Sequence, residues 1–127
     1  MSLSLDHAAL WVKDLEKMRA FYVDVLGGAA GPRYRNGATG FESYFITFGG
    51  SRIELMHRSG LDAAPAREAH GYAHVALSAG SRSEVDSRAE ALRQAGVEVV
   101  SPPRQTGDGY YEAVILDPEG NRIEIVA

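Results

Sequence analysis

The sequence contains no cysteine among its 127 residues. A disulfide framework and thiolate chemistry are therefore excluded, and we expect a reducing, intracellular environment. No apolar run approaches the roughly 20 residues that a membrane-spanning helix requires. Residues 1–5 also lack the basic start and long apolar stretch of a secretory signal. We therefore predict a cytoplasmic protein with no membrane partner.

Stretches of basic residues are missing as well. Thirteen Lys and Arg against 17 Asp and Glu give a formal net charge of −4. A surface for nucleic acid or anionic lipid requires clustered positive charge, so both partners are excluded and a small-molecule substrate is expected. A length of 127 residues corresponds to one domain, 1–127, with a core of its own.

The most informative feature present is an internal repeat. Arg52–Met56 reads RIELM and Arg122–Val126 reads RIEIV, while residues 6–12 (DHAALWV) are echoed by residues 73–79 (AHVALSA). The histidines at the start of each half lie 67 positions apart (74 − 7), and the glutamates lie 70 apart (124 − 54). Two copies of a small β-rich module would produce this spacing.

Alternation and turn residues predict the same order of elements, strand, helix, strand, strand, strand, in both halves. Asp14 and Ser81 are the expected N-caps of the two helices. Module one spans 1–57, a linker spans 58–70, and module two spans 71–127. The predicted strands cover residues 5–12, 33–35, 41–48, 52–57, 72–79, 97–101, 110–116 and 122–126. We therefore predict an α+β fold of two βαβββ modules.

Strand alternation also predicts the direction of the repeated polar side chains. Glu54 is flanked by Ile53 and Leu55, and Glu124 by Ile123 and Ile125, so each glutamate points away from the apolar face. His7 and His74 likewise alternate with apolar neighbours. A single strand histidine or glutamate is more often structural or solvated. Because both types recur with matching flanks, we predict that His7, Glu54, His74 and Glu124 are metal ligands.

Two imidazoles and two carboxylates suit divalent nickel, cobalt, zinc, manganese or iron. Two octahedral positions would remain for substrate oxygens, and the metal would stabilise an enediolate formed by proton removal next to a carbonyl. A carboxylate that leaves the metal is a suitable base. Either Glu54 or Glu124 fits this catalytic role.

These residues resemble the vicinal oxygen chelate superfamily, which contains glyoxalase I, methylmalonyl-CoA epimerase, extradiol dioxygenases and fosfomycin and bleomycin resistance proteins. The resemblance rests on DHAALWVKDLEKMRAFYVDVLGG, RIELM, GYAHVAL and DPEGNRIEI. It implies a cupped, mixed but mostly antiparallel sheet in a homodimer, with the metal inside the cup. The implied ligands are again His7, Glu54, His74 and Glu124, a set similar to that of bacterial glyoxalase I, which favours nickel or cobalt, with zinc common in relatives.

The sequence departs from glyoxalase I where that enzyme contacts glutathione. The arginine four residues after the first histidine is Trp11 here, and the asparagine four residues after the first glutamate is Arg58. We therefore expect a glyoxalase-like lyase or isomerase that acts on another small carbonyl or hydroxy-carbonyl compound. The expected pocket residues are aromatic or cationic: Trp11, Tyr44, Phe48, Arg52, Tyr110 and Arg122. Ordinary sheet packing is an equally good explanation for each aromatic residue.

Three other functions of this superfamily remain open. A metal-free drug-binding protein of the bleomycin-resistance type would use the aromatic residues but not the four ligands. An extradiol dioxygenase would hold iron with two histidines and one glutamate, which leaves Glu54 unexplained. A thiol transferase of the fosfomycin class would also keep only three ligands.

Overall fold

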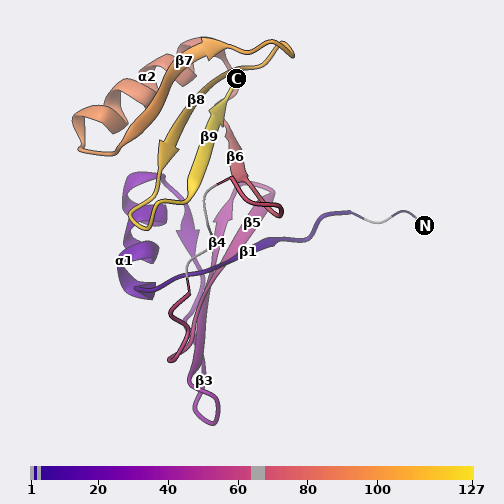
Figure 1. Ribbon diagram of the computed structural model, residues 1–127, viewed down its shortest axis with the longest axis vertical. Helices are drawn as coiled ribbons and strands as arrows, with labels where there is room; N and C mark the ends of the chain where they lie inside the picture. Colours follow the sequence, from indigo (N-terminus) through magenta and orange to yellow (C-terminus); the bar gives the residue numbers. More distant parts are fainter. Residues whose placement is uncertain (1, 3, 64–67) are drawn as a thin grey trace. The chain divides into compact units, whose positions relative to one another are not determined.

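The chain divides into two compact units, Met1–Ala64 and Pro65–Ala127 (Figure 1). The structure is a computed structural model that describes residues 2, 4–63 and 68–127. The division falls within the predicted linker 58–70, of which residues 64–67 lie outside the described residues. Each unit is considered by itself below. That residues 1–127 form one domain stays a prediction.

The first unit begins with a short strand and a capped helix. The Asp14 carboxylate accepts a hydrogen bond from the Lys17 backbone N–H at 3.1 Å, as expected of an N-cap. The helix continues as a π-helical turn, η1, before the glycines that end it. The elements of this unit are β1 (Ala8–Trp11), α1 (Leu15–Ala20), η1 (Phe21–Val25), β2 (Ala29–Ala30), β3 (Tyr34–Asn36), β4 (Phe41–Phe48) and β5 (Ser51–His57).

The second unit repeats the plan with a longer helix. Ser81 caps that helix by accepting a hydrogen bond from the Glu84 N–H at 3.2 Å, which confirms the predicted start. The elements are β6 (His74–Ser78), α2 (Arg82–Gln94), β7 (Val99–Gln105), β8 (Tyr111–Leu116) and β9 (Arg122–Val126). In the described part of the chain, no helix combines the length and apolar character needed to cross a bilayer.

The two sheets share one topology. The first has the order β1-β5-β4-β2 with β3 also paired to β4, and the second has the order β6-β9-β8-β7. In each, the first and last strands of the module run parallel and the other pairs are antiparallel. The predicted α+β fold of two βαβββ modules is confirmed.

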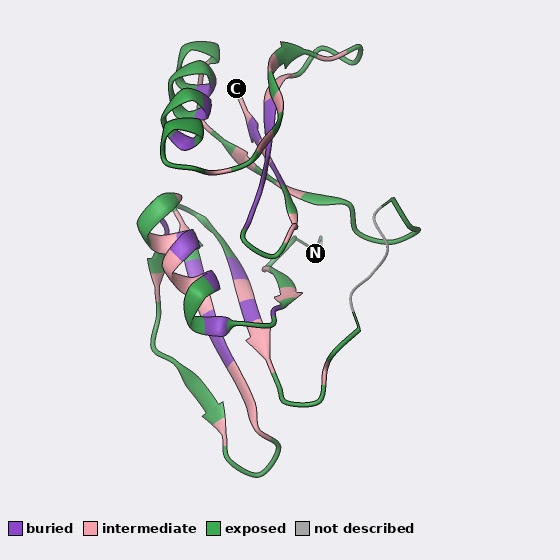
Figure 2. Ribbon diagram, turned by 60° about the vertical axis from the view of Figure 1, so that its left-hand side comes forward, coloured by how far each residue is buried: buried purple, intermediate pink, exposed green. Residues whose placement is uncertain are grey.

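Each helix covers one face of its own sheet, and each unit has its own core between its helix and its sheet (Figure 2). In the first unit Met18 and Leu55 are fully buried, and in the second Val85 and Ile115 are. Along β5 and β9 the buried residues alternate with partly exposed ones. The opposite face of each sheet is therefore the one that carries the polar side chains.

The strand edges differ from prediction in two places. The segment predicted to contain one short strand near residues 33–35 holds both β2 and β3. In the second unit β7 extends through Pro102 and Pro103 to Gln105, beyond the predicted end at Ser101. Proline is tolerated there because β7 is an edge strand, and its register with β8 shifts on both sides of Ser101.

Candidate metal centre

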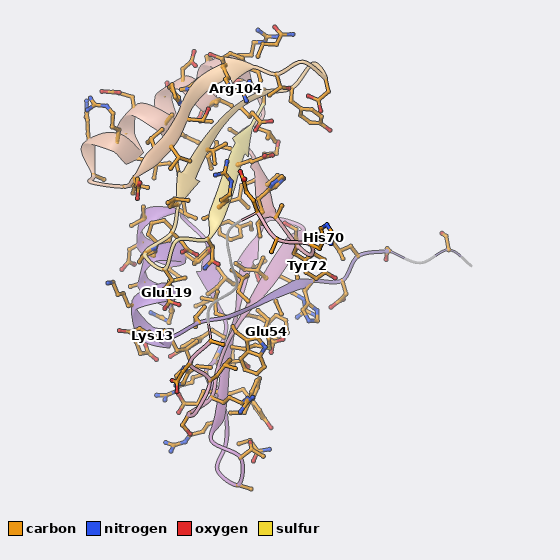
Figure 3. The ribbon with its side chains drawn as sticks, in the orientation of Figure 1. Lys13, Glu54, His70, Tyr72, Arg104 and Glu119 are labelled. Carbon is orange, nitrogen blue, oxygen red and sulfur yellow. The ribbon has the colours of Figure 1, made fainter. Side chains whose placement is uncertain are left out.

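In the first unit, strand pairing brings His7 next to Glu54. Parallel pairing sets Ala9 of β1 opposite Glu54 of β5, and His7 precedes Ala9 by two residues, on the same face. The His7 Nε2 atom lies 3.6 Å from the Glu54 Oε1 atom. The two side chains are 33% and 17% exposed, so both are accessible to a ligand without being fully solvated. Figure 3 labels Glu54.

The second unit builds the same pair with the same register. Ala76 of β6 lies opposite Glu124 of β9, and His74 precedes Ala76 by two residues. The His74 Nε2 atom lies 3.2 Å from the Glu124 Oε1 atom, with the side chains 38% and 19% exposed. The repeat seen in the sequence is therefore a repeat of side-chain geometry.

These distances fit a pair of groups that bind one cation. A nitrogen and an oxygen, each about 2.0–2.2 Å from a metal and on adjacent positions, are roughly 3–3.5 Å apart. Both pairs are within or near that range. Among the described residues, no set of three or more histidine, cysteine, aspartate or glutamate side chains is arranged to hold a metal ion. Each unit thus supplies a pair.

A charged and aromatic shell surrounds the first pair. The Asp6 carboxylate lies 2.7 Å from His7 Nδ1 and 2.8 Å from an Arg52 guanidinium nitrogen. These contacts, that of His7 first, lower the pKa of Asp6 below its ordinary value of 3.8. Phe45, opposite Glu54 on β4, meets the His7 ring edge to face with the centroids 5.1 Å apart.

The second pair has an acidic neighbour that the sequence reasoning missed. Glu112 of β8 precedes Val114 by two residues, and Val114 is paired with Glu124, so both carboxylates lie on one face. Burial raises the pKa of Glu112, and the negative charge of Glu124 raises it further. Arg104 of β7, labelled in Figure 3, is paired with Glu112 and partly offsets this effect. The sequence offered one signal, a glutamate inside the predicted strand 110–116, but only the register of β8 with β9 places Glu112 beside Glu124.

Three of the predicted pocket residues lie on the same strand faces as the ligand pairs. Trp11, the last residue of β1, lies four residues after His7, which places both side chains on the same face, and it is 47% exposed. Arg52 contacts Asp6, and Arg122 is paired with His74 in the register of β6 and β9. Tyr110, 56% exposed, belongs to the turn before β8.

Tyr44 and Phe48 lie on the opposite face, which corrects their predicted place in the pocket. The Tyr44 hydroxyl donates a hydrogen bond to Glu16 of α1 at 2.6 Å, which raises the pKa of Tyr44 above 10.0, with burial adding to the effect. A Cβ atom added at Gly28, after η1, would lie 2.9 Å from the Phe48 ring. Both rings therefore pack on the helix-covered face.

The aromatic residues of β4 that share the ligand face are Phe41 and Phe45. The Phe41 ring meets Trp11 edge to face at 6.1 Å and lies 6.1 Å from the ring of Tyr34. Aromatic residues occupy both faces of β4, so the residue type alone does not show which of them lie on the ligand face. The register set by the Gly49–Gly50 turn, which pairs Phe45 with Glu54, decides the assignment.

The two remaining histidines lie outside these pairs. His57 ends β5, as predicted, and its Nδ1 atom lies 3.0 Å from the carbonyl oxygen of Val12. His70 lies in the segment before β6. Arg58, at the position where the predicted glutathione contact is missing, places its guanidinium carbon 5.6 Å from the Trp11 ring centroid.

Comparison with known proteins agrees with the fold and its repeat. Residues 4–125 match the sequence profile of the Glyoxalase/Bleomycin resistance protein/Dioxygenase superfamily. A lactoylglutathione lyase of Salmonella typhimurium is 30% identical over 129 residues, which cover 98% of this chain and 92% of that protein. The mitochondrial methylmalonyl-CoA epimerase of Bos taurus is 31% identical over 122 residues, or 90% of this chain and 66% of the epimerase.

Solved structures show the same fold. A glyoxylase/bleomycin resistance protein/dioxygenase domain from Frankia sp. EAN1pec aligns with a TM-score of 0.83 and 23% identity, covering 98% of both chains. Trypanothione-dependent glyoxalase I of Leishmania major aligns with a TM-score of 0.77 and 22% identity, covering 98% of this chain and 86% of that one. The match over residues 4–125, together with the duplicated βαβββ module, shows that this chain belongs to the glyoxalase/bleomycin resistance protein/dioxygenase superfamily.

Proposed function

We propose that this protein is a metal-dependent lyase or isomerase that acts on a small carbonyl or hydroxy-carbonyl compound. The observation that supports this proposal most strongly is the duplicated pair of histidine and glutamate at equivalent register, 3.6 and 3.2 Å apart. The similarity to a lactoylglutathione lyase and to a methylmalonyl-CoA epimerase supports the same reaction class.

In this proposal His7, Glu54, His74 and Glu124 together hold one divalent cation, with nickel, cobalt or zinc preferred over manganese or iron. The ligands come either from one chain or from two chains of a homodimer. The cation would supply the Lewis acidity that stabilises negative charge developing on substrate oxygen. Neutral imidazole and ionised carboxylate are the forms that bind such a cation.

The protein groups then move the proton. Glu54 or Glu124 accepts a proton from the carbon next to the substrate carbonyl. The same carboxylic acid returns the proton to the neighbouring carbon in an isomerisation, so the substrate and product have the same composition. Phe45 packs edge to face against the His7 ring and forms part of the apolar surface on the ligand face.

The pocket residues would orient the substrate. Trp11, together with Phe41, offers an apolar wall on the ligand face of the first unit. Arg52, Arg122 and Tyr110 are the proposed contacts for an anionic or oxygen-rich group. Because Trp11 and Arg58 replace the two glutathione contacts of glyoxalase I, we expect no turnover of methylglyoxal with glutathione.

Metal content of single variants tests the proposal. We expect about one divalent ion per chain after reconstitution, and loss of that ion in both Glu54→Ala and His74→Ala, since each removes one of four shared ligands. Glu98→Ala and His70→Ala are matched controls, because both residues lie outside the pairs. Both variants should therefore retain the ion. Two independent sites would instead leave each variant with half of the metal, which would contradict a shared centre.

A metal-free drug-binding protein is the second candidate function. It is favoured by the exposed aromatic cluster on the ligand face of the first unit, in which Tyr34 is 54% and Trp11 47% exposed. Wild-type protein that holds no stoichiometric metal after reconstitution, yet binds an aromatic ligand with quenching of Trp11 fluorescence, would favour this candidate. An iron-dependent oxygenase would be identified by oxygen consumption.

A further inference from the structure

His7 is held from two sides. One of the contacts comes from Asp6, the residue before it, whereas an alanine precedes His74. On one side, a single oxygen of Asp6, Oδ2, lies 2.7 Å from His7 Nδ1 and 2.8 Å from an Arg52 nitrogen. Arg52 belongs to β5, two residues before Glu54 and on the same face. The carboxylate thus joins the segment before β1 to the strand that carries the partner glutamate.

On the other side, one aromatic ring contacts both partners of this carboxylate. The Arg52 guanidinium carbon lies 4.3 Å from the centroid of the Phe45 ring, a cation–π distance. The His7 ring meets the same Phe45 ring edge to face at 5.1 Å. Rotation of the imidazole would therefore break the Asp6 contact and the ring contact together.

The Asp6 contact also selects the tautomer of His7. An ionised carboxylate only accepts hydrogen bonds, so the proton of a neutral imidazole is placed on Nδ1. The lone pair then lies on Nε2, the atom that is 3.6 Å from Glu54. A histidine that binds a metal through one nitrogen commonly donates the other N–H to a carboxylate in this way.

The second unit lacks this carboxylate by sequence. Ala73 stands before His74 where Asp6 stands before His7. The register of the strands is otherwise the same, since Ala9 pairs with Glu54 and Ala76 with Glu124. The two halves therefore differ in whether a carboxylate directly precedes the histidine.

We propose that Asp6 and Arg52 are positioning residues that fix the Nδ1–H tautomer and the ring orientation of His7, so that the first half of the centre is preorganised by a carboxylate that has no counterpart at position 73 of the second half. The inference rests on the proposed function in that His7 is taken as a cation ligand. Its first test, however, needs no metal.

The first measurement is the tautomer of each histidine in the metal-free protein at about pH 8, by long-range ¹H–¹⁵N NMR. We expect His7 to be an Nδ1–H tautomer in the wild type and to shift toward the Nε2–H form in Asp6→Ala. His57, whose Nδ1 faces the Val12 carbonyl oxygen, serves as the unchanged internal reference.

The second measurement is metal affinity by chelator competition with Zn²⁺. Asp6→Ala should lower the affinity by about 10–100-fold, the usual effect of removing such a partner. Asp62→Ala removes an exposed charge from the same unit and should leave the affinity unchanged. Asp6→Glu, which keeps the carboxylate, should restore part of the loss.

The two proposals fail in different ways. A His7 tautomer that is Nε2–H in the wild type, or that does not respond to Asp6→Ala, overturns the positioning role whether or not metal binds. Equal Zn²⁺ affinity in Asp6→Ala and wild type overturns it as well. If the wild-type protein binds no metal but its His7 tautomer shifts as expected in Asp6→Ala, the positioning of His7 is supported and the proposed function is contradicted.

Discussion

Among glycine-to-alanine substitutions, we expect the one at Gly28 to lower the stability of the protein most. A Cβ atom added there would lie 2.5 Å from Ile46 Cγ2, 2.9 Å from Phe48 Cζ and 3.0 Å from the Tyr22 carbonyl oxygen. Ile46 and Tyr22 are almost completely buried. The Tyr22 carbonyl oxygen also accepts the Gly28 N–H hydrogen bond at 2.9 Å, so it cannot move away without loosening the end of η1.

Overpacking a buried site by a methyl group typically costs about 1–3 kcal/mol. We place Gly28→Ala in the upper part of that range, because three separate atoms are too close and one of them is backbone. Urea denaturation of the metal-free protein would measure this as a fall in the free energy of unfolding at unchanged m-value. The added methyl group would push against β4, which carries Phe45 on its other face. We therefore also expect weaker metal binding by His7 and Glu54.

Two glycine substitutions separate crowding from other causes. Gly50→Ala meets no atom within 4 Å and should change stability by less than about 0.5 kcal/mol. Gly27→Ala is equally uncrowded, but its φ of 80° disfavours any side chain and should cost about 1–2 kcal/mol. If Gly28→Ala were as mild as Gly50→Ala, the packing of η1 against β4 described here would be refuted.

Two further substitutions test other contacts. Tyr44→Phe removes the hydrogen bond to Glu16 and should cost about 1 kcal/mol at neutral pH. Because the folded-state pKa of Tyr44 is raised, this contribution is fully present below pH 10 and is lost as the pH rises through the folded-state value. Denaturation curves of both proteins should therefore converge once the pH exceeds the raised folded-state pKa of Tyr44, and a constant difference would contradict the assignment. Asp117→Ala removes a buried carboxylate that accepts hydrogen bonds from the backbone N–H groups of Glu119 and Asn121, both at 2.9 Å. We expect a loss of about 1–3 kcal/mol by thermal denaturation, with Asp117→Asn intermediate; an unchanged midpoint would show that the turn before β9 does not depend on this residue.

The amino-acid sequence by itself determined the duplicated plan and the direction of the four proposed ligands. Alternation along a strand is a local property with a period of two, so the apolar neighbours of Glu54 and Glu124 fix which face each carboxylate occupies. The helix starts at Asp14 and Ser81 were predictable for a similar reason, since a cap acts on the first turn only.

Only the tertiary structure decided which residues from other strands share that face. Phe45 rather than Tyr44 lies opposite Glu54 because the turn at Gly49–Gly50 sets the register, and a shift of one residue would exchange the two faces. The contact of Asp6 with Arg52 joins positions 46 residues apart. Such a contact depends on where the chain returns, which no local pattern of residues encodes.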